Sequence, residues 1–399
     1  MHFEGDLVNG GSSTDQSSNY NNTVTSENIL VNSHSETDYA LYAGKLTVEQ
    51  PLFGGKIVYG GEGSYTDNRQ QFEMLNEEVA QDLPSNHDKN EQQLWAAFLS
   101  YEHSWNYFSL NAGLRYEHIN FKYYYDDQYR EEQSRIYNNC FPSVALSYRK
   151  GSINMSLSDK TTVRRPNYFN LRSAISYNSP YNYEGGPSLK PMYINKLTYL
   201  AGWKDLQLEV SYNWIKDNLL FVGRQFEDKP IVLFMMENLP YCEQLDMYVS
   251  YSPQIDIWKP TFTLGFDKQN LKYQNRSYNK PYYSYAWNNI FQFPNNFQFI
   301  INMRGNLNGN NNIILNKSGF RTDIRVSKKF LDDKLHLILS ATDIFSTNLE
   351  RWSMTTNNMY EDKWNDSDNR GINLQIIYKF NSTQDKYKGR GATNEINRL

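Results

Sequence analysis

The sequence predicts an all-β protein, an antiparallel β-barrel that spans a membrane. Three observations predict this fold class. Stretches of roughly ten residues alternate between apolar and polar side chains, and the connections between them alternate between short and long. The chain is also polar overall, with a mean hydropathy of −0.73, although 15% of its residues are aromatic. This composition suits a sheet whose apolar surface is confined to every second residue.

The strands are predicted from the alternation itself. Apolar Leu206, Leu208 and Val210 alternate with polar Gln207, Glu209 and Ser211. Because successive side chains of a strand point to opposite faces, one face of this segment is apolar and the other is polar. We predict about fifteen strands of this kind, which begin near residues 40, 56, 94, 107, 142, 152, 195, 206, 244, 258, 284, 297, 319, 334 and 371.

The connections give the predicted barrel a direction. The short ones are residues 51–55, 104–106, 149–151, 204–205, 252–257, 293–296 and 329–333. The long ones are residues 66–93, 118–141, 159–194, 216–243, 267–283, 305–318 and 344–370. Barrels of outer membranes have short turns on the periplasmic side and long loops outside. Aromatic residues gather at the short-turn end, as an interfacial girdle would: Trp105, Tyr107, Tyr148, Trp203, Trp258, Phe293, Phe297, Phe330 and Phe380.

The strand count suggests that this barrel is incomplete. Bacterial barrels of this kind have an even number of strands, whereas about fifteen are predicted here. With an odd count, the first and last strands run in the same direction and cannot pair antiparallel to close the ring. We therefore divide the chain into a polar N-terminal segment at 1–39, expected to be an extracellular loop, barrel strands and loops at 40–380, and a polar C-terminal tail at 381–399.

Composition excludes several other classes. The longest apolar run, Ile231 to Met236, is far shorter than a transmembrane helix requires, and the first residues lack the pattern of a signal peptide. The net charge of −4 comes without a basic stripe, so no nucleic-acid partner is expected. Two cysteines, Cys140 and Cys242, are too few for a disulfide framework, and whether they pair is left open.

Residues 158–191 carry a family resemblance. The matching positions are Arg165, Pro166, Leu171, Tyr181, Tyr183, Gly185, Pro187, Leu189, Lys190 and Pro191, with Gly186 where an Asn is usual. The segment resembles the outer-membrane β-barrel family of TonB-dependent receptors of Bacteroidota. The resemblance implies localisation in the cell outer membrane and a barrel of about 22 strands with a plug domain and a TonB-contact segment before it. On that pattern, about seven strands and the plug are expected to be absent from this chain.

The resemblance implies a receptor and transporter for TonB-dependent nutrient uptake. Its expected partners are outer-membrane lipid and, in a longer chain, a plug domain and TonB, with a surface lipoprotein as a further candidate. The alternative is a non-transporting barrel, either structural or a remnant of a truncated gene. An upstream reading frame that encodes a signal peptide and a plug would favour the transporter. An outer-membrane hydrolase and a secreted carbohydrate-binding protein are weaker alternatives.

No residues indicate catalysis, a metal site or a cofactor, because the six histidines are scattered and form no paired ligand spacing. We therefore predict that the chain is not an enzyme. Two aromatic clusters are candidate ligand contacts, because tyrosine offers a flat apolar face and a hydroxyl: Tyr123, Tyr124 and Tyr125, and Tyr282, Tyr283 and Tyr285. These rings could equally extend an outer girdle or pack loops together. For Arg165 and Pro166, organisation of a loop is favoured over substrate binding.

Overall fold

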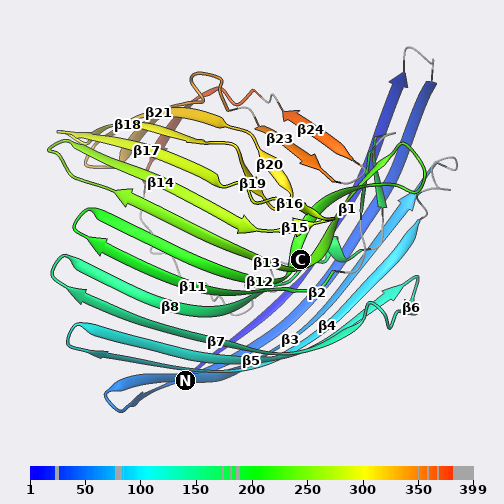
Figure 1. Cartoon of the computed structure of the whole chain (residues 1–399), viewed down its shortest axis with the longest axis horizontal. Coiled ribbons are helices and arrows are strands. Elements are labelled where there is room, and N and C mark those ends of the chain that lie inside the picture. Colours follow the sequence, from blue (N-terminus) through cyan, green and yellow to red (C-terminus); the bar gives the residue numbers. More distant parts are fainter. Residues whose placement is uncertain are drawn as a thin grey trace.

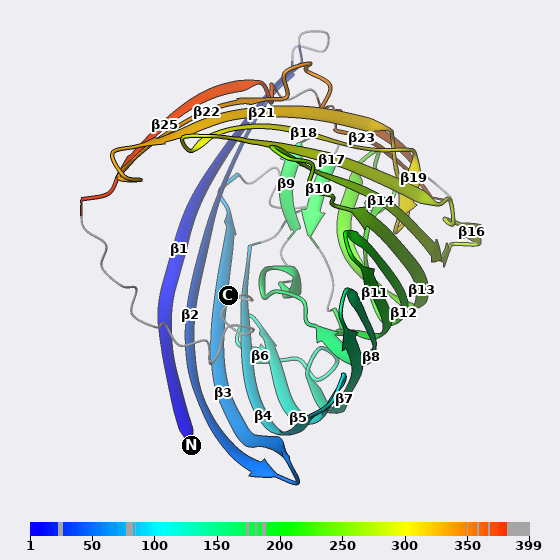
Figure 2. The same cartoon turned by 90° about the vertical axis from the view of Figure 1, so that its left-hand side faces the viewer.

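A computed structural model of the chain describes residues 1–22, 27–76, 83, 85–172, 175–179, 182–185, 189–348, 350–356, 359–365 and 368–380. Its main element is a 19-stranded sheet. The sheet curls into an incomplete ring, with the short turns gathered at one end of the wall and the longer loops at the other (Figures 1 and 2). Among the described residues, no helix is long and apolar enough to cross a membrane.

Sixteen of the 19 strands in this sheet form the wall of the ring. They are β1 (His2–Asn22), β2 (Glu27–Leu52), β3 (Gly55–Met74), β4 (Asn86–Trp105), β5 (Phe108–Tyr125), β7 (Arg135–Lys150), β8 (Ile153–Arg164), β11 (Met192–Trp203), β12 (Leu206–Gln225), β13 (Val232–Tyr251), β14 (Trp258–Asn270), β17 (Tyr282–Phe293), β18 (Phe297–Asn306), β21 (Gly319–Phe330), β22 (Leu335–Thr342) and β25 (Gly371–Tyr378). Each pairs antiparallel with the next along the chain.

The remaining elements are short. The main sheet also includes β6 (Gln128–Tyr129), β9 (Ile175–Ser179) and β10 (Asn182–Gly185), and η1 (Phe169–Leu171) is a single 3₁₀ turn. At the loop end of the wall, β15 (Lys272–Tyr273) and β16 (Arg276–Ser277) form a two-stranded sheet. Nearby, β19 (Gly309–Asn311), β20 (Ile314–Asn316), β23 (Glu350–Thr355) and β24 (Tyr360–Asn365) form a four-stranded one.

The N-terminal prediction was wrong. Residues 1–39 are not a loop but contain β1 and the first half of β2, which pair from His2–Thr47 to Asn22–Glu27. The sequence did not indicate β1, because much of this strand lacks apolar alternation. Strand pairing itself needs only the backbone groups. The fifteen predicted strands therefore become sixteen, and the argument from an odd count fails. The predicted C-terminal tail at 381–399 lies outside the described residues.

The ring is nevertheless open. Within the described residues, β1 pairs only with β2 among the wall strands, and β25 pairs only with β22. Both edges therefore present backbone donors and acceptors that no neighbouring strand satisfies. In hydrocarbon, each such group costs several kcal/mol.

The short turns are confirmed, and local backbone conformation explains them. Left-handed φ angles occur at Gly54 (77°), Asn106 (49°) and Gly151 (57°). Glycine and asparagine tolerate this conformation, which two-residue hairpins require. The long loops are shorter than predicted, because β3 continues to Met74 and β12 to Gln225. The outer half of β3 is mostly polar, so its apolar alternation stops before the strand does. The outer half of β12 instead contains Leu219, Leu220, Phe221 and Val222, of which Leu220 and Val222 are buried in a hydrophobic core.

Several wall strands are longer than a membrane span. We call the part that spans the membrane the membrane band and the part that extends beyond it the projecting rim. A membrane-spanning β-strand needs only about 9–11 residues, whereas β3, β4, β12 and β13 have 20 residues each. At the short-turn end, aromatic rings mark one boundary of the band, and Lys150 and Lys204 place their amines 5.0 and 5.2 Å from the rings of Tyr107 and Trp203. Aromatic rings with snorkelling lysines are typical of a membrane–water interface.

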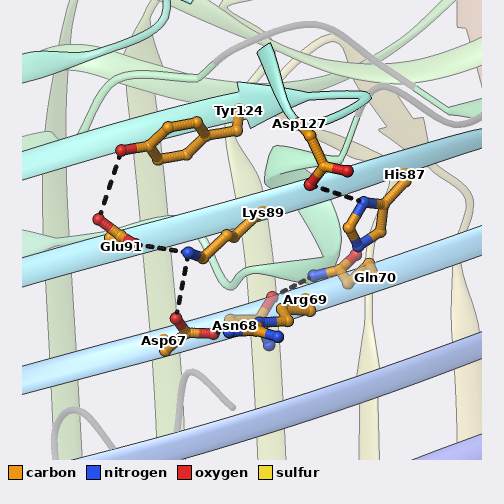
Figure 3. Close-up of polar contacts among 9 residues, drawn as sticks. All are labelled: Asp67, Asn68, Arg69, Gln70, His87, Lys89, Glu91, Tyr124 and Asp127. Carbon is orange, nitrogen blue, oxygen red and sulfur yellow. Dashed lines mark hydrogen bonds and ion pairs between the residues drawn. The ribbon is translucent and has the colours of Figure 1, made fainter. Parts of the chain in front are cut away.

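The outer halves of β3 and β4 carry charges on the outward face (Figure 3). Lys89 lies 3.6 Å from Asp67 and 2.6 Å from Glu91, and its amine sits 5.3 Å from the centre of the Tyr124 ring. Arg69 donates to Asp67 at 2.9 Å. Charges are costly on a lipid-facing surface, so this part of the wall belongs to the projecting rim. Because the pairs are partly exposed, each contributes little to stability.

The β1–β2 register predicts a pH-dependent contact. His34 lies opposite Asp15, with Nδ1 and Oδ1 2.7 Å apart. This hydrogen bond raises the pKa of His34 above its usual 6.5. The charged pair therefore supports the outer hairpin at low pH and is lost as the pH rises through the raised pKa. An NMR titration of His34 should show the raised value, and Asp15→Asn should lower it.

Asp6→Asn is the matched control, because Asp6 lies on the same strand opposite Ala43. It should leave the His34 titration unchanged. If Asp15→Asn also leaves it unchanged, β1 does not pair with β2 in this register.

Candidate functional site

The interior of the ring is occupied by part of the chain itself (Figure 2). It belongs to residues 165–191, here called the interior loop, of which the structure describes 165–172, 175–179, 182–185 and 189–191. It leaves the end of β8, returns at the start of β11, and contains η1, β9 and β10. Figure 2 shows these three elements inside the ring of wall strands. The loop includes nearly all of the segment in which the sequence shows its family resemblance.

A buried ion cluster fixes the start of this loop to the wall. Arg165 donates to the carboxylate of Glu117 on β5. Arg115 donates to the other Glu117 oxygen at 2.6 Å and to Glu62 on β3 at 3.0 Å. Glu117 is only 5% exposed. A buried carboxylate is costly without partners, and the two arginines provide them.

Apolar packing holds the same part of the loop. Tyr168, Leu171 and Leu189 are buried and form one core with wall residues Leu94, Ala96, Ile119, Phe121 and Tyr123. Pro166 and Pro191 are buried as well, beside Ile119 and Phe121. Arg165 and Pro166 thus contact the wall, and their role in organising the loop stays a prediction. Gly185 ends β10, and Pro187 lies outside the described residues.

The far end of the interior loop reaches other wall strands. β10 pairs in parallel with the outer end of β13, from Asn182–Val232 to Glu184–Phe234. The side chain of Asn238 on β13 bonds both backbone groups of Lys190, at 2.8 and 3.0 Å. Gln16 on β1 donates to the carbonyl of Tyr177 at 3.2 Å. The loop is therefore a strut that connects β5, β13 and β1 across the interior.

Two polar cavities open on the inner face of the wall. The first, about 640 Å³, lies between β4, β5, β7 and β8 next to the strut, and its charged lining is Arg115, Glu117, Lys160, Arg164 and Arg165. The second, about 470 Å³, lies on β14, β17, β18 and β21 under the loops, and its charged lining is Arg304, Lys317, Arg321, Glu350 and Arg351. Both have the polar groups and the size to hold a small solute.

The predicted tyrosine clusters are not continuous surfaces. Tyr123, Tyr124 and Tyr125 belong to β5 rather than to a loop, so alternate rings point to opposite faces. Tyr123 is 4% exposed and donates to Asp88 on the inner side, whereas Tyr124 lies outside beside Lys89. On β17, Tyr282 lines the second cavity. Tyr283 lies on the opposite face of β17 and packs against Phe266. Tyr285 lies on the same face as Tyr283, and its side chain also borders the cavity. Ligand contact by any of these rings stays a prediction.

In the part of the chain that the structure describes, no group of three or more His, Cys, Asp or Glu side chains could hold a metal ion. Cys140 and Cys242 are free thiols, the first exposed and the second buried. The arrangement offers charged and hydroxyl groups around water-sized and solute-sized spaces.

Comparison with known families decides the classification. The model of the outer membrane protein beta-barrel family matches residues 2–378. The chain belongs to this family. The match begins at the first residue of β1, in agreement with the structure and not with the loop predicted at 1–39. Membership of the outer membrane protein beta-barrel family also confirms the predicted localisation in the outer membrane. The narrower Bacteroidota type stays a prediction.

Solved structures share the fold of this member of the family. The FrpB iron transporter from Neisseria meningitidis aligns with a TM-score of 0.56 and 15% identity over 94% of this chain and 63% of its own. The copper transporter OprC aligns with a TM-score of 0.67 and 11% identity over 94% and 62%. The siderophore receptor PirA from Pseudomonas aeruginosa gives 0.57 and 12% over 87% and 61%.

At these identities, the likeness concerns the fold alone. The chain spans less than two thirds of the length of each of these proteins. No curated protein sequence matches the chain.

Sequence reasoning missed part of the second cavity. Alternation along β21 places Arg321 and Asp323 on one face of that strand, and Asn302, Arg304 and Asn306 follow the same period in β18. Lys317 comes from the connection between β20 and β21, and Arg351 comes from β23. The position of these segments over the wall has no signal in the sequence.

The ion cluster predicts a clear effect of Glu117→Gln. The substitution leaves Arg115 and Arg165 with a neutral partner in a buried site, which should cost about 3 kcal/mol of stability. It should also speed tryptic cleavage in the interior loop, because that loop loses its anchor on β5. Urea unfolding in detergent micelles and timed proteolysis measure the two effects.

Glu209→Gln is the matched control for this prediction. Glu209 pairs with Lys196 at 3.7 Å, and the two side chains are 39% and 42% exposed. Its loss should cost less than about 1 kcal/mol. Equal effects of the two substitutions would mean that the cluster does not anchor the loop.

Proposed function

We propose that this chain forms the wall of an outer-membrane receptor for TonB-dependent uptake of a small nutrient. The family match over residues 2–378 is the observation that carries the proposal. The names of the structural neighbours support it, because they describe transporters of iron and copper and a receptor for a siderophore. The polar inner face and its two cavities are what a route for a polar solute needs.

In this proposal, the chain's own residues bind and guide the solute. The loops at the outer rim provide the first contact. The strut formed by the interior loop narrows the passage between β5, β13 and β1, so that a solute moves along the charged inner wall. A plug domain and TonB provide gating and energy, and a surface lipoprotein is a further candidate partner at the rim.

We also propose that further strands and a plug complete the working receptor. The two unpaired edges, β1 and β25, support this proposal, because an open edge in hydrocarbon is unfavourable. The coverage of about 60% of each neighbour's length agrees with it. Strands that pair with β1 and with β25 would satisfy both edges and close the ring.

Uptake measurements test the proposal in two parts. The full chain reconstituted alone in liposomes should give no TonB-coupled uptake of radiolabelled iron or copper chelates. In the native host, disruption of the gene should lower uptake of its solute only in cells that contain TonB. Energy-dependent uptake by the chain alone would overturn the incomplete receptor, and an equal loss with and without TonB would overturn the transport mechanism.

A further inference from the structure

Two arginines face each other in the second cavity. Arg304 on β18 and Arg321 on β21 are direct cross-strand partners, and both line the cavity on the inner face. Like charges directly opposite one another destabilise a sheet. The pairing is therefore unfavourable unless an anion lies between or above the two guanidinium groups.

One carboxylate, Asp323, is near both arginines. Arg304 acts on it through its charge alone, whereas Arg321 is hydrogen-bonded to it. Arg321 donates from Nε to Asp323 at 2.7 Å. The same carboxylate oxygen also accepts the backbone N–H of Asp343 at 2.9 Å, so its capacity is largely used. Among the described residues, Arg304 forms no ion pair, and its side chain is exposed to the cavity.

The loops above add further positive charge. Lys317 and Arg351 line the cavity and are joined by a backbone hydrogen bond of 3.0 Å, from the N–H of Lys317 to the carbonyl of Arg351. Glu350 is the carboxylate of the lining, and its side chain accepts a hydrogen bond from Asn365 at 3.4 Å. Tyr282 and Ser284 add hydroxyl groups on the same face of β17.

We infer that this cavity is a binding site for a small oxyanion with two or three charges, of the carboxylate or phosphate class. Guanidinium groups hold such oxygens through paired charge-assisted hydrogen bonds, and four cations around about 470 Å³ suit a multivalent anion of modest size. The inference rests on the proposed function for its biological meaning, since it names the class of solute. Binding itself needs neither TonB nor a plug.

Isothermal titration of the full chain in detergent micelles at low salt tests the site. Citrate and pyrophosphate should bind, and acetate should bind at least about tenfold more weakly because it engages fewer of the cations. Acetate also stands in for a single side-chain carboxylate of another protein segment. If acetate binds as tightly as citrate, the site serves such a side chain, and the inference of a diffusible multivalent anion is overturned.

Arg304→Gln should weaken citrate binding about tenfold or more. The same variant should unfold at a higher temperature than the parent in anion-free buffer, because it removes the repulsion from Arg321, and citrate should no longer raise that temperature. Arg325→Gln is the matched control, on the same face of β21 but outside the cavity lining, and it should leave both measurements unchanged.

Two results would overturn the site itself. One is an absence of citrate and pyrophosphate binding by the parent chain, and the other is an unchanged affinity in Arg304→Gln. Since no step of the test involves transport, a failed uptake experiment and a failed binding experiment remain distinguishable.

Discussion

Backbone hydrogen bonding in a medium without water is the constraint on which this structure depends. Hydrocarbon offers no partner to an N–H or C=O group, so each wall strand must pair with a neighbour on both sides. Antiparallel pairing of consecutive strands achieves this with short turns, and it leaves side chains alternating between lipid and interior. The open edges at β1 and β25 are the two places where the described chain does not meet the constraint.

The constraint does not apply to the outer halves of the strands, so their outward face need not be apolar. Beyond the membrane band, the sheet is surrounded by water, and its outward face can carry the ion pairs of Asp67, Lys89 and Glu91. Backbone pairing continues there without interruption, which is why β3 and β4 are twice as long as a span requires. A rim of this kind holds the loops well away from the lipid and gives the interior loop strands to pack against.

Inside the ring, the two groups of charged residues have different roles. The Glu117 cluster and the core around Tyr168 attach the interior loop to the wall. The core is buried, and the Glu117 carboxylate is paired with two arginines although the cluster borders the first cavity. In the second cavity, Arg304 is exposed and forms no ion pair among the described residues, whereas Arg321 is paired with Asp323. Charges that are paired with each other stabilise the structure, whereas an exposed charge without a partner can bind a ligand of opposite charge. The distinction separates the anchor of the loop from the candidate binding site, although both are built from arginine and carboxylate on neighbouring strands.

The sequence by itself determined the fold class, the positions of fifteen wall strands, the short turns and the face on which Arg115, Glu117 and Arg321 lie. These features follow from local chemistry, because alternation of period two and residues such as Gly54 and Asn106 act within a few positions. It also marked residues 158–191 by their family resemblance. Only the tertiary structure decided that this segment crosses the interior, that β1 is a strand, and that Arg304 stands opposite Arg321. Each of these depends on pairing or packing between residues distant in the chain, and a polar strand outside the membrane carries no hydrophobic pattern that would reveal its partner.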